Sequence, residues 1–276
     1  YYAHHDKEDD KVALAIREHY QPRYAGDELP STPESLAVAL ADKIETLTGL
    51  FGIGQLPTGE KDPFALRRHA LGILRMLIEK ELPLSLDKLI AIGTEEESVV
   101  PGVKDATEEL KQFFHDRLRV MQKDQGFTAH EVESVIGSEP AILADVPKRL
   151  KAVHDFMSLP EAESLAAANK RIENILKKNT LPLADAVDPA LLTEKEEKDL
   201  YEAIRTLEPK LEADYKAGRY EDELRSLAPL KAPVDAFFDK VMVNAEDEAL
   251  RRNRLTLLNE LHKAMNQVAK LSCLAS

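Results

Sequence analysis

Three arginines lie within four positions near one end of an acidic chain, in the stretch "NAEDEALRRNRLTLL" at 244–258. A guanidinium group carries a planar fork of N–H donors that matches phosphate and carboxylate oxygens, so the cluster indicates anion recognition or internal ion pairing. If the apolar residues of this helix face the core, Arg252 points nearly opposite, Arg251 lies at the flank and Arg254 falls within the apolar stripe. The three side chains therefore cannot share one role.

An arginine on the core side needs a partner, because a buried and unpaired guanidinium is strongly destabilising. Asp235, Asp239 and Asn244, in or just after the preceding helix, are the predicted partners of Arg254. We accordingly predict one structural arginine beside two that face a ligand. The core face expected for this helix consists of Leu250, Leu257, Leu258, Leu261, Met265 and Val268.

A second basic helix is predicted in "AESLAAANKRIENILKK" at 162–178. At about 100 degrees per residue, Lys170, Asn174 and Lys177 lie opposite the apolar stripe, and Arg171 and Lys178 flank them. Charged outer faces are common on solvated helices, so one interpretation is a face that binds nothing. The functional alternative is a patch of amide and cationic donors suited to phosphates and base edges. The apolar stripe consists of Leu165, Ala168, Ile172, Ile175 and Leu176.

The turn "GLFGIGQLPTGEKDP" at 49–63 contains four of the chain's 11 glycines and only partly resembles a phosphate-binding loop. Gly54 and Gly59 have the spacing of a P-loop, but Glu60 stands where lysine is required, and the preceding element is a predicted helix rather than a strand. A structural turn is one interpretation. The other is contact with an anion or nucleic acid beside the N–H groups of the next helix start. The donors for such a contact are Gln55, Lys61, Arg67 and Arg68.

Histidines next to carboxylates suggest metal binding at His4-His5-Asp6 and at His115-Asp116. In addition, "LADKIETL" with Asp42 resembles the last motif of the HD phosphohydrolase superfamily. A working HD centre needs an upstream histidine, a His-Asp pair and this distal aspartate around one metal ion, and the upstream part is absent. We therefore predict no metal site. We also predict no catalytic residue, because no serine or cysteine is distinguished as the partner of another histidine.

Composition favours a soluble all-α protein. The 276 residues include 43% hydrophobic, 32% charged and only 5% aromatic residues, and apolar residues recur with helical spacing throughout. No apolar run reaches the roughly 18–20 residues that cross a bilayer, so we expect a cytoplasmic protein without a membrane partner. The net charge of -13 disfavours broad adhesion to nucleic acid, DNA included, but permits a specific basic site. The single cysteine, Cys273, excludes an internal disulfide and fits a reducing compartment.

Turn signals divide the chain into three expected parts. The best boundary is "GTEEESVVPG" at 93–102, which joins glycine, proline and an acidic run. We predict a helical region at 1–97, a helical connecting region at 98–160 and an antiparallel helical bundle at 161–276. The chain opens "YYAHHDKEDD" without a methionine, which indicates a piece of a longer protein. Helices are predicted at 34–50, 64–80, 86–92, 104–124, 128–136, 145–157, 161–178, 193–215, 218–227, 230–243 and 246–271.

Several long stretches resemble a known family, namely "YYAHHDKEDDKVALAIREHYQPRYAGDELP", "ALADKIETLTGLFGIGQLPTGEKDPFALRRHALGILR", "AAANKRIENIL" and "GRYEDELRSLAPLKAPVDAFFDKVMVNAEDEALRRNRLTLL". Together they closely resemble the C-terminal portion of the β subunit of bacterial tetrameric glycyl-tRNA synthetases. The likeness covers essentially residues 1–274, and "FGIGQLPTGEKDPFALRR" is a highly specific motif.

The resemblance implies an incomplete HD-like region at 1–97 and, at 161–276, an anticodon-binding bundle similar to that of arginyl-tRNA synthetase. It also implies a class II ligase of α2β2 composition, in which the α subunit holds glycine, ATP and Mg²⁺ while the β subunit binds tRNA(Gly). This chain would then be a noncatalytic part with no cofactor of its own. The rival interpretation is a remnant of a metal-dependent HD-type phosphohydrolase.

The resemblance assigns the domains, and donor chemistry selects residues within them. Phe237, Phe238 and Tyr220 lie near the basic residues in sequence and are the expected stacking platforms for bases. The expected contacts with the anticodon loop are Lys170, Arg171, Asn174, Lys177, Arg251, Arg252 and Arg254. The expected contacts with another part of the tRNA are Gln55, Lys61, Arg67 and Arg68.

Overall fold

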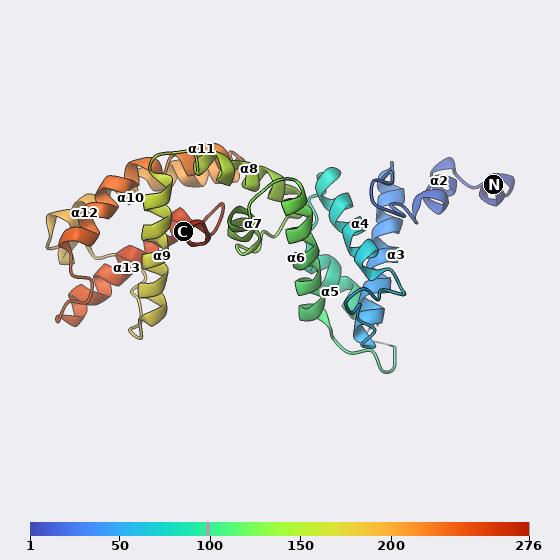
Figure 1. The fold of residues 1–276 in the computed structure, drawn as a ribbon, viewed down its shortest axis with the longest axis horizontal. Coiled ribbons are helices and arrows are strands. Elements are labelled where there is room, and N and C mark those ends of the chain that lie inside the picture. The colour runs from blue at the N-terminus through green and yellow to red at the C-terminus, as the bar shows by residue number, and fades with distance from the viewer. Residues whose placement is uncertain (98–99, 276) are drawn as a thin grey trace. The chain divides into compact units, whose positions relative to one another are not determined.

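The computed structural model describes residues 1–97 and 100–275, which form an all-α protein (Figure 1). Within those ranges there is no β-strand beyond two isolated bridge pairs, so the predicted fold class is confirmed. The α-helices are α1 (Tyr2–His5), α2 (Asp10–Glu18), α3 (Pro33–Gly52), α4 (Leu66–Glu79), α5 (Leu86–Glu97), α6 (Thr107–Asp124), α7 (Ala129–Ile136), α8 (Val146–Phe156), α9 (Ala162–Lys178), α10 (Lys195–Lys216), α11 (Tyr220–Arg225), α12 (Lys231–Lys240) and α13 (Glu248–Met265). The 3-10 helices are η1 (Leu143–Asp145), η2 (Pro189–Leu191), η3 (Ala228–Leu230) and η4 (Leu271–Leu274).

The chain divides into two compact units. Unit 1 consists of Tyr1–Gly126 and Pro140–Pro147, and unit 2 consists of Phe127–Glu139 and Lys148–Ser276. The three-part division predicted at 1–97, 98–160 and 161–276 has different limits and stays a prediction. Its first boundary falls on residues 98–99, which lie outside the described residues.

Unit 1 is organised around α3, which contacts α2, α4, α5 and α6. The start of α3 is encoded locally, because Pro33 occupies the first turn and the Thr32 hydroxyl accepts a hydrogen bond from the Ser35 backbone N–H at 3.2 Å. The core of the unit is made by fully buried apolar side chains on α3, α4, α5 and α6. They include Leu47, Ile73, Leu74 and Ile90.

Gly52, at the end of α3, permits a close approach between two backbones. The Lys104 N–H donates to the Gly52 carbonyl at 2.9 Å, and a Cβ at Gly52 would lie 2.9 Å from the Lys104 carbonyl oxygen and against the Val103 side chain. We expect Gly52→Ala to lower the free energy of unfolding by about 1–3 kcal/mol, measured by urea denaturation. Gly49→Ala on the same helix is the control, because its Cβ would meet only the end of the Glu97 side chain. Equal losses from both changes would contradict this explanation.

Unit 2 is a helical bundle in which α10 contacts α12 and α13, while α9 contacts α12 and α13 (Figure 1). The apolar stripes predicted for α9 and α13 supply much of its core. The fully buried side chains include Leu165, Ile172, Leu200, Phe237, Leu257 and Leu261. The bundle thus positions α9 and α13, the two helices that carry the basic residues.

Two differences from the predicted helices have physical reasons. The predicted helix at 246–271 ends earlier, at Met265, because the Asn266 side chain accepts from the Leu271 N–H at 2.9 Å and donates to the His262 carbonyl at 2.6 Å. The short helix α2 was not predicted; it begins after Asp9, whose side chain accepts from the Lys11 N–H at 2.8 Å. No described helix combines the length and the apolar character needed to cross a bilayer.

Candidate functional site

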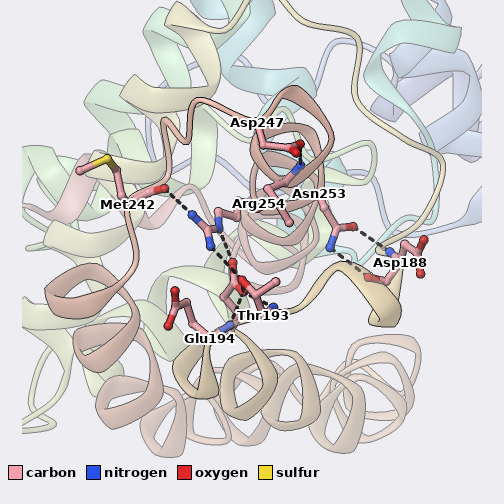
Figure 2. A network of polar contacts seen from close by, with 9 residues as sticks. Asp188, Thr193, Glu194, Met242, Asp247, Asn253 and Arg254 are labelled. Atoms are coloured by element: carbon pink, nitrogen blue, oxygen red, sulfur yellow. Dashed lines mark hydrogen bonds and ion pairs between the residues drawn. The ribbon is translucent and has the colours of Figure 1, made fainter.

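Arg254 lies inside the bundle of unit 2, where it is only 6% exposed. Its Nε forms an ion pair with the Glu197 carboxylate of α10, its Nη1 donates to the Met242 carbonyl at 2.8 Å, and its Nη2 donates to the Thr193 hydroxyl at 3.3 Å (Figure 2). The inward position predicted from the helical period is confirmed. The predicted partners Asp235, Asp239 and Asn244 are wrong, because α10 and not α12 supplies the carboxylate. With every guanidinium nitrogen engaged, Arg254 is a poor ligand donor.

The neighbouring Asn253 is a polar core residue that the sequence did not indicate. It is 2% exposed, and its side chain accepts from the Asp188 N–H at 2.7 Å and donates to the Asp188 carbonyl at 3.0 Å (Figure 2). This reciprocal pair fixes the loop before α10 to α13. The buried polar layer at 253–254 therefore sets the register of α13 in the bundle, and so the position of the two arginines before it.

Arg251 and Arg252 lie at the surface end of the same helix. The Arg252 side chain is 41% exposed and approaches Glu248 at 3.4 Å, an i,i+4 pair of the weak, solvated kind. Arg251 is half-buried and has no hydrogen-bond or ion-pair partner among the described residues, its Nε being enclosed. Both guanidinium groups therefore retain donors for a ligand.

The predicted basic face of α9 splits into two stripes. On one stripe, Lys177 pairs with Glu173 at 2.7 Å and Lys170 approaches the Ala275 carbonyl at 3.4 Å. Partial burial raises the pKa of Glu173, but hydrogen bonds from Lys177, Ser272 and Lys270 outweigh it and bring the pKa to about 2. Lys170 and Lys177 are thus partly occupied by contacts within the protein, whereas Asn174 is exposed without a partner among the described side chains.

The second stripe of α9 contains Arg171, Ile175 and Lys178, which share a face because they are spaced by three and four residues. The exposed Arg171 guanidinium lies over the Phe238 ring, with its carbon 4.1 Å from the ring centre. Phe238 is the half-exposed member of the three predicted stacking platforms. The prediction is wrong for Phe237 and Tyr220, because both are core residues with exposures of 0% and 6%.

A pocket of about 450 Å³ lies between the second stripe of α9 and the helix α13. Arg251 of α13 and Lys178 of α9 both line it, with the Asn244 and Asn179 amides. Sequence reasoning named Arg251 but did not assign Lys178, Asn244 or Asn179 to the site, because only the packing of α9 against α13 brings them together. We use the name α9–α13 edge for the cationic and amide side chains of α9, of α13 and of the loop before α13 that keep donors for a ligand. They are Arg171, Asn174, Lys178, Asn244, Arg251 and Arg252.

The candidate residues of unit 1 are only partly gathered. Arg67 donates to the Gly59 carbonyl at 2.6 Å and lines a pocket of about 840 Å³ together with Arg68. Gln55 and Lys61 are exposed and do not line that pocket. The expectation that N–H groups at the start of α4 await an anion is wrong, because the Asp62 carboxylate already accepts from Leu66 at 2.8 Å and from Arg67 at 3.0 Å.

The residues considered for a metal do not converge in the described part of the chain. No group of three His, Cys, Asp or Glu side chains suited to a metal ion occurs there. His4 instead lies 3.2 Å from Asp10, and Asp116 accepts from Gln112 at 2.7 Å and from Arg119 at 3.2 Å. The metal-dependent alternative therefore has no candidate centre among these residues.

An all-α bundle with an exposed edge of cationic and amide donors is suited to binding nucleic acid, and comparison with known proteins specifies its class. Residues 165–272 match the family model described as the DALR anticodon binding domain. Residues 1–137 match the model of the glycyl-tRNA synthetase beta subunit. The chain belongs to the glycyl-tRNA synthetase beta subunit family.

Curated relatives named glycine-tRNA ligase beta subunit are similar over the whole chain. Those of Delftia acidovorans and Polaromonas naphthalenivorans are each 55% identical over 100% of this chain, and that of Nitrosomonas eutropha is 50% identical over 100% of it. The chain spans 39%, 38% and 40% of the lengths of these three proteins. It therefore corresponds to about two fifths of each relative.

Proposed function

We propose that this chain is the tRNA-binding C-terminal part of a glycyl-tRNA synthetase β subunit and supports the ATP-dependent ligation of glycine to tRNA(Gly). The observation that carries the proposal is the coincidence of the anticodon-binding match at 165–272 with a compact bundle that bears the α9–α13 edge. In this proposal the chemistry takes place on an α subunit of a class II enzyme, which binds ATP and Mg²⁺. The assembly is α2β2 and cytoplasmic, and this chain supplies no catalytic residue.

The α9–α13 edge has the chemistry that single-stranded RNA loops require. Arg251, Arg252 and Lys178 offer donors to phosphates, and the amides of Asn174 and Asn244 can both donate to and accept from base edges. The exposed Arg171 guanidinium, which lies over the Phe238 ring at 4.1 Å, is a proposed stacking partner for an unstacked base. In unit 1, Gln55, Lys61, Arg67 and Arg68 are the proposed contacts with another part of the tRNA.

Replacing Arg251 or Arg252 with alanine is expected to weaken binding of tRNA(Gly) by about 3–10-fold and to reduce the salt slope by about one each, since each change removes a phosphate donor. Electrophoretic mobility shifts at several salt concentrations measure both effects. The matched control is Lys216→Ala at the far end of α10, where an exposed lysine pairs with Glu212 at 2.6 Å. If Lys216→Ala weakened tRNA binding as much, the assignment of tRNA binding to the α9–α13 edge would be wrong.

The proposed anticodon reading needs a separate comparison. Binding to tRNA(Gly) should exceed binding to the same tRNA with a changed anticodon, and the difference should shrink in the Asn174→Ala variant, because that amide is a proposed reader of base edges. Absence of any shift at low salt would contradict tRNA binding itself. Equal binding to both tRNAs would contradict anticodon recognition while leaving tRNA binding intact.

A further inference from the structure

A second polar pocket, of about 410 Å³, lies in unit 1 and is separate from every contact proposed above except Arg68. The loop after α2, the helix α3 and the helix α4 each supply part of its wall. The polar and aromatic residues that line it are Tyr20, Arg23, Asp42, Lys43, Arg68 and His69.

Lys43 is a buried cation in this wall, with only 2% of its surface exposed. Its ammonium group donates one hydrogen bond, to the His19 carbonyl at 3.0 Å, and has no carboxylate within ion-pair distance among the described residues. Burial lowers the pKa of Lys43, and the nearby charge of Asp42 opposes that shift only in part. An ammonium has three donors, so two N–H groups of a desolvated charge await an acceptor.

Two neighbours on α4 are also without acceptors. The Arg68 side chain is exposed and makes no hydrogen bond or ion pair with the described residues. His69 has an enclosed Nδ1 without a hydrogen-bond partner, and burial, followed by the charge of Lys43, lowers its pKa. By contrast, Arg23 is occupied by Asp27 at 2.9 and 3.2 Å.

The packing leaves the Lys43 side chain room to reach this position. Gly72 of α4 lies beside it, where a Cβ would come within 3.2 Å of the Lys43 Cε. Besides Arg23, which Asp27 occupies, the cations Lys43 and Arg68 line the pocket against one carboxylate, Asp42, so the local field favours an anion over a divalent cation. The arrangement therefore suits a small anionic group with several acceptor oxygens.

We propose that this pocket binds the phosphate group of a nucleotide, held by Lys43, Arg68 and the His69 ring, with Asp42 accepting from a sugar hydroxyl. The phosphate comes either from RNA or from a free nucleotide, since both offer the same chemistry. The proposal goes beyond the proposed function, because it assigns a nucleotide phosphate to a pocket that Lys43 and His69 line, and it holds whether or not unit 2 reads an anticodon.

Titration of the 276-residue chain with adenosine 5′-monophosphate, followed by calorimetry, tests the pocket. Lys43→Met keeps an unbranched apolar stem and removes the charge, and Arg68→Ala alters an exposed side chain that the fold does not need. Each is expected to weaken binding at least about tenfold, because charge-assisted hydrogen bonds to phosphate are lost. Lys88→Ala, an exposed lysine of α5, is the control and should leave binding unchanged.

Binding that survives both Lys43→Met and Arg68→Ala would overturn the proposal, as would equal binding of adenosine without phosphate. Thermal melting of each variant confirms that the fold persists, and Arg68→Ala keeps the test decisive if Lys43→Met unfolds. Displacement of the nucleotide by tRNA(Gly) assigns the pocket to an RNA phosphate. Failure of tRNA(Gly) to displace it assigns the pocket to a free nucleotide.

Discussion

Replacing Arg254 with alanine is expected to lower the free energy of unfolding by about 3–5 kcal/mol, whereas Arg252→Ala, two residues earlier, should change it by less than about 1 kcal/mol. The difference follows from burial, because the side chains of Arg254 and Glu197 are 7% and 0% exposed while that of Arg252 is 41% exposed. Removal of Arg254 leaves the Glu197 carboxylate enclosed without its cation. Chemical denaturation of both variants, monitored by circular dichroism, measures the two losses.

The partners of Glu197 explain why the loss should be large yet not complete. The carboxylate also accepts from the N–H groups of Thr193 and Glu194, each at 2.8 Å, and from the Thr193 hydroxyl at 3.3 Å, so it keeps three hydrogen bonds when Arg254 is removed. Adding Glu197→Gln to Arg254→Ala should recover part of the stability, because the buried charge is then removed as well. Equal losses from Arg252→Ala and Arg254→Ala would contradict the division of the cluster into inward and outward arginines.

The helical period was sufficient to predict where each arginine points, but not what each contacts. A residue's face follows from the sequence of one helix, so Arg254 inside and Arg252 outside could both be predicted. The partner of Arg254 comes from α10, 57 positions away in sequence, and depends on the register between two helices. The same limit explains why Asn253 and the pocket shared by Lys178 and Arg251 were not foreseen.

The sequence also does not show which charged side chains become buried, as unit 1 illustrates. A lysine on an amphipathic helix is normally solvated, so "ADKIET" gave no reason to single out Lys43. Its enclosure depends on the chain after α2, whose His19 carbonyl accepts from Lys43 at 3.0 Å. Sequence reasoning found Arg68 through its basic character, and only the fold shows that Lys43 and His69 line the same pocket.

Glu223 of α11 is expected to make the stability of the folded protein depend strongly on pH. Its side chain is fully buried, and neither carboxylate oxygen has a hydrogen-bond partner among the described residues. Burial, followed by the charge of Asp214, raises the pKa of Glu223 to about 8, against the opposing charges of Arg149 and Lys210. The folded protein therefore holds a proton here at neutral pH that the unfolded chain releases.

The sign of the effect follows from this difference in bound protons. Between the unfolded value of 4.5 and about 8, the folded state binds one more proton at Glu223, so its contribution to stability falls as pH rises. The stabilisation from Glu223 is fully present below the unfolded pKa of 4.5, and it is completely lost above the folded pKa of about 8. With about 1.4 kcal/mol for each pH unit, the total is on the order of 3–5 kcal/mol.

Glu223→Gln keeps the shape of the side chain and removes its titration. We expect the variant to match the unmodified protein near pH 5 and to exceed it by roughly 3–5 kcal/mol at pH 9, since glutamine never has to ionise inside the bundle. Urea denaturation at intervals from pH 5 to 9 measures the difference, and Glu202→Gln, an exposed change on α10, should show none. A difference that stays constant across this range would mean that the Glu223 carboxylate is already ionised in the folded bundle, with Arg149 and Lys210 outweighing its burial.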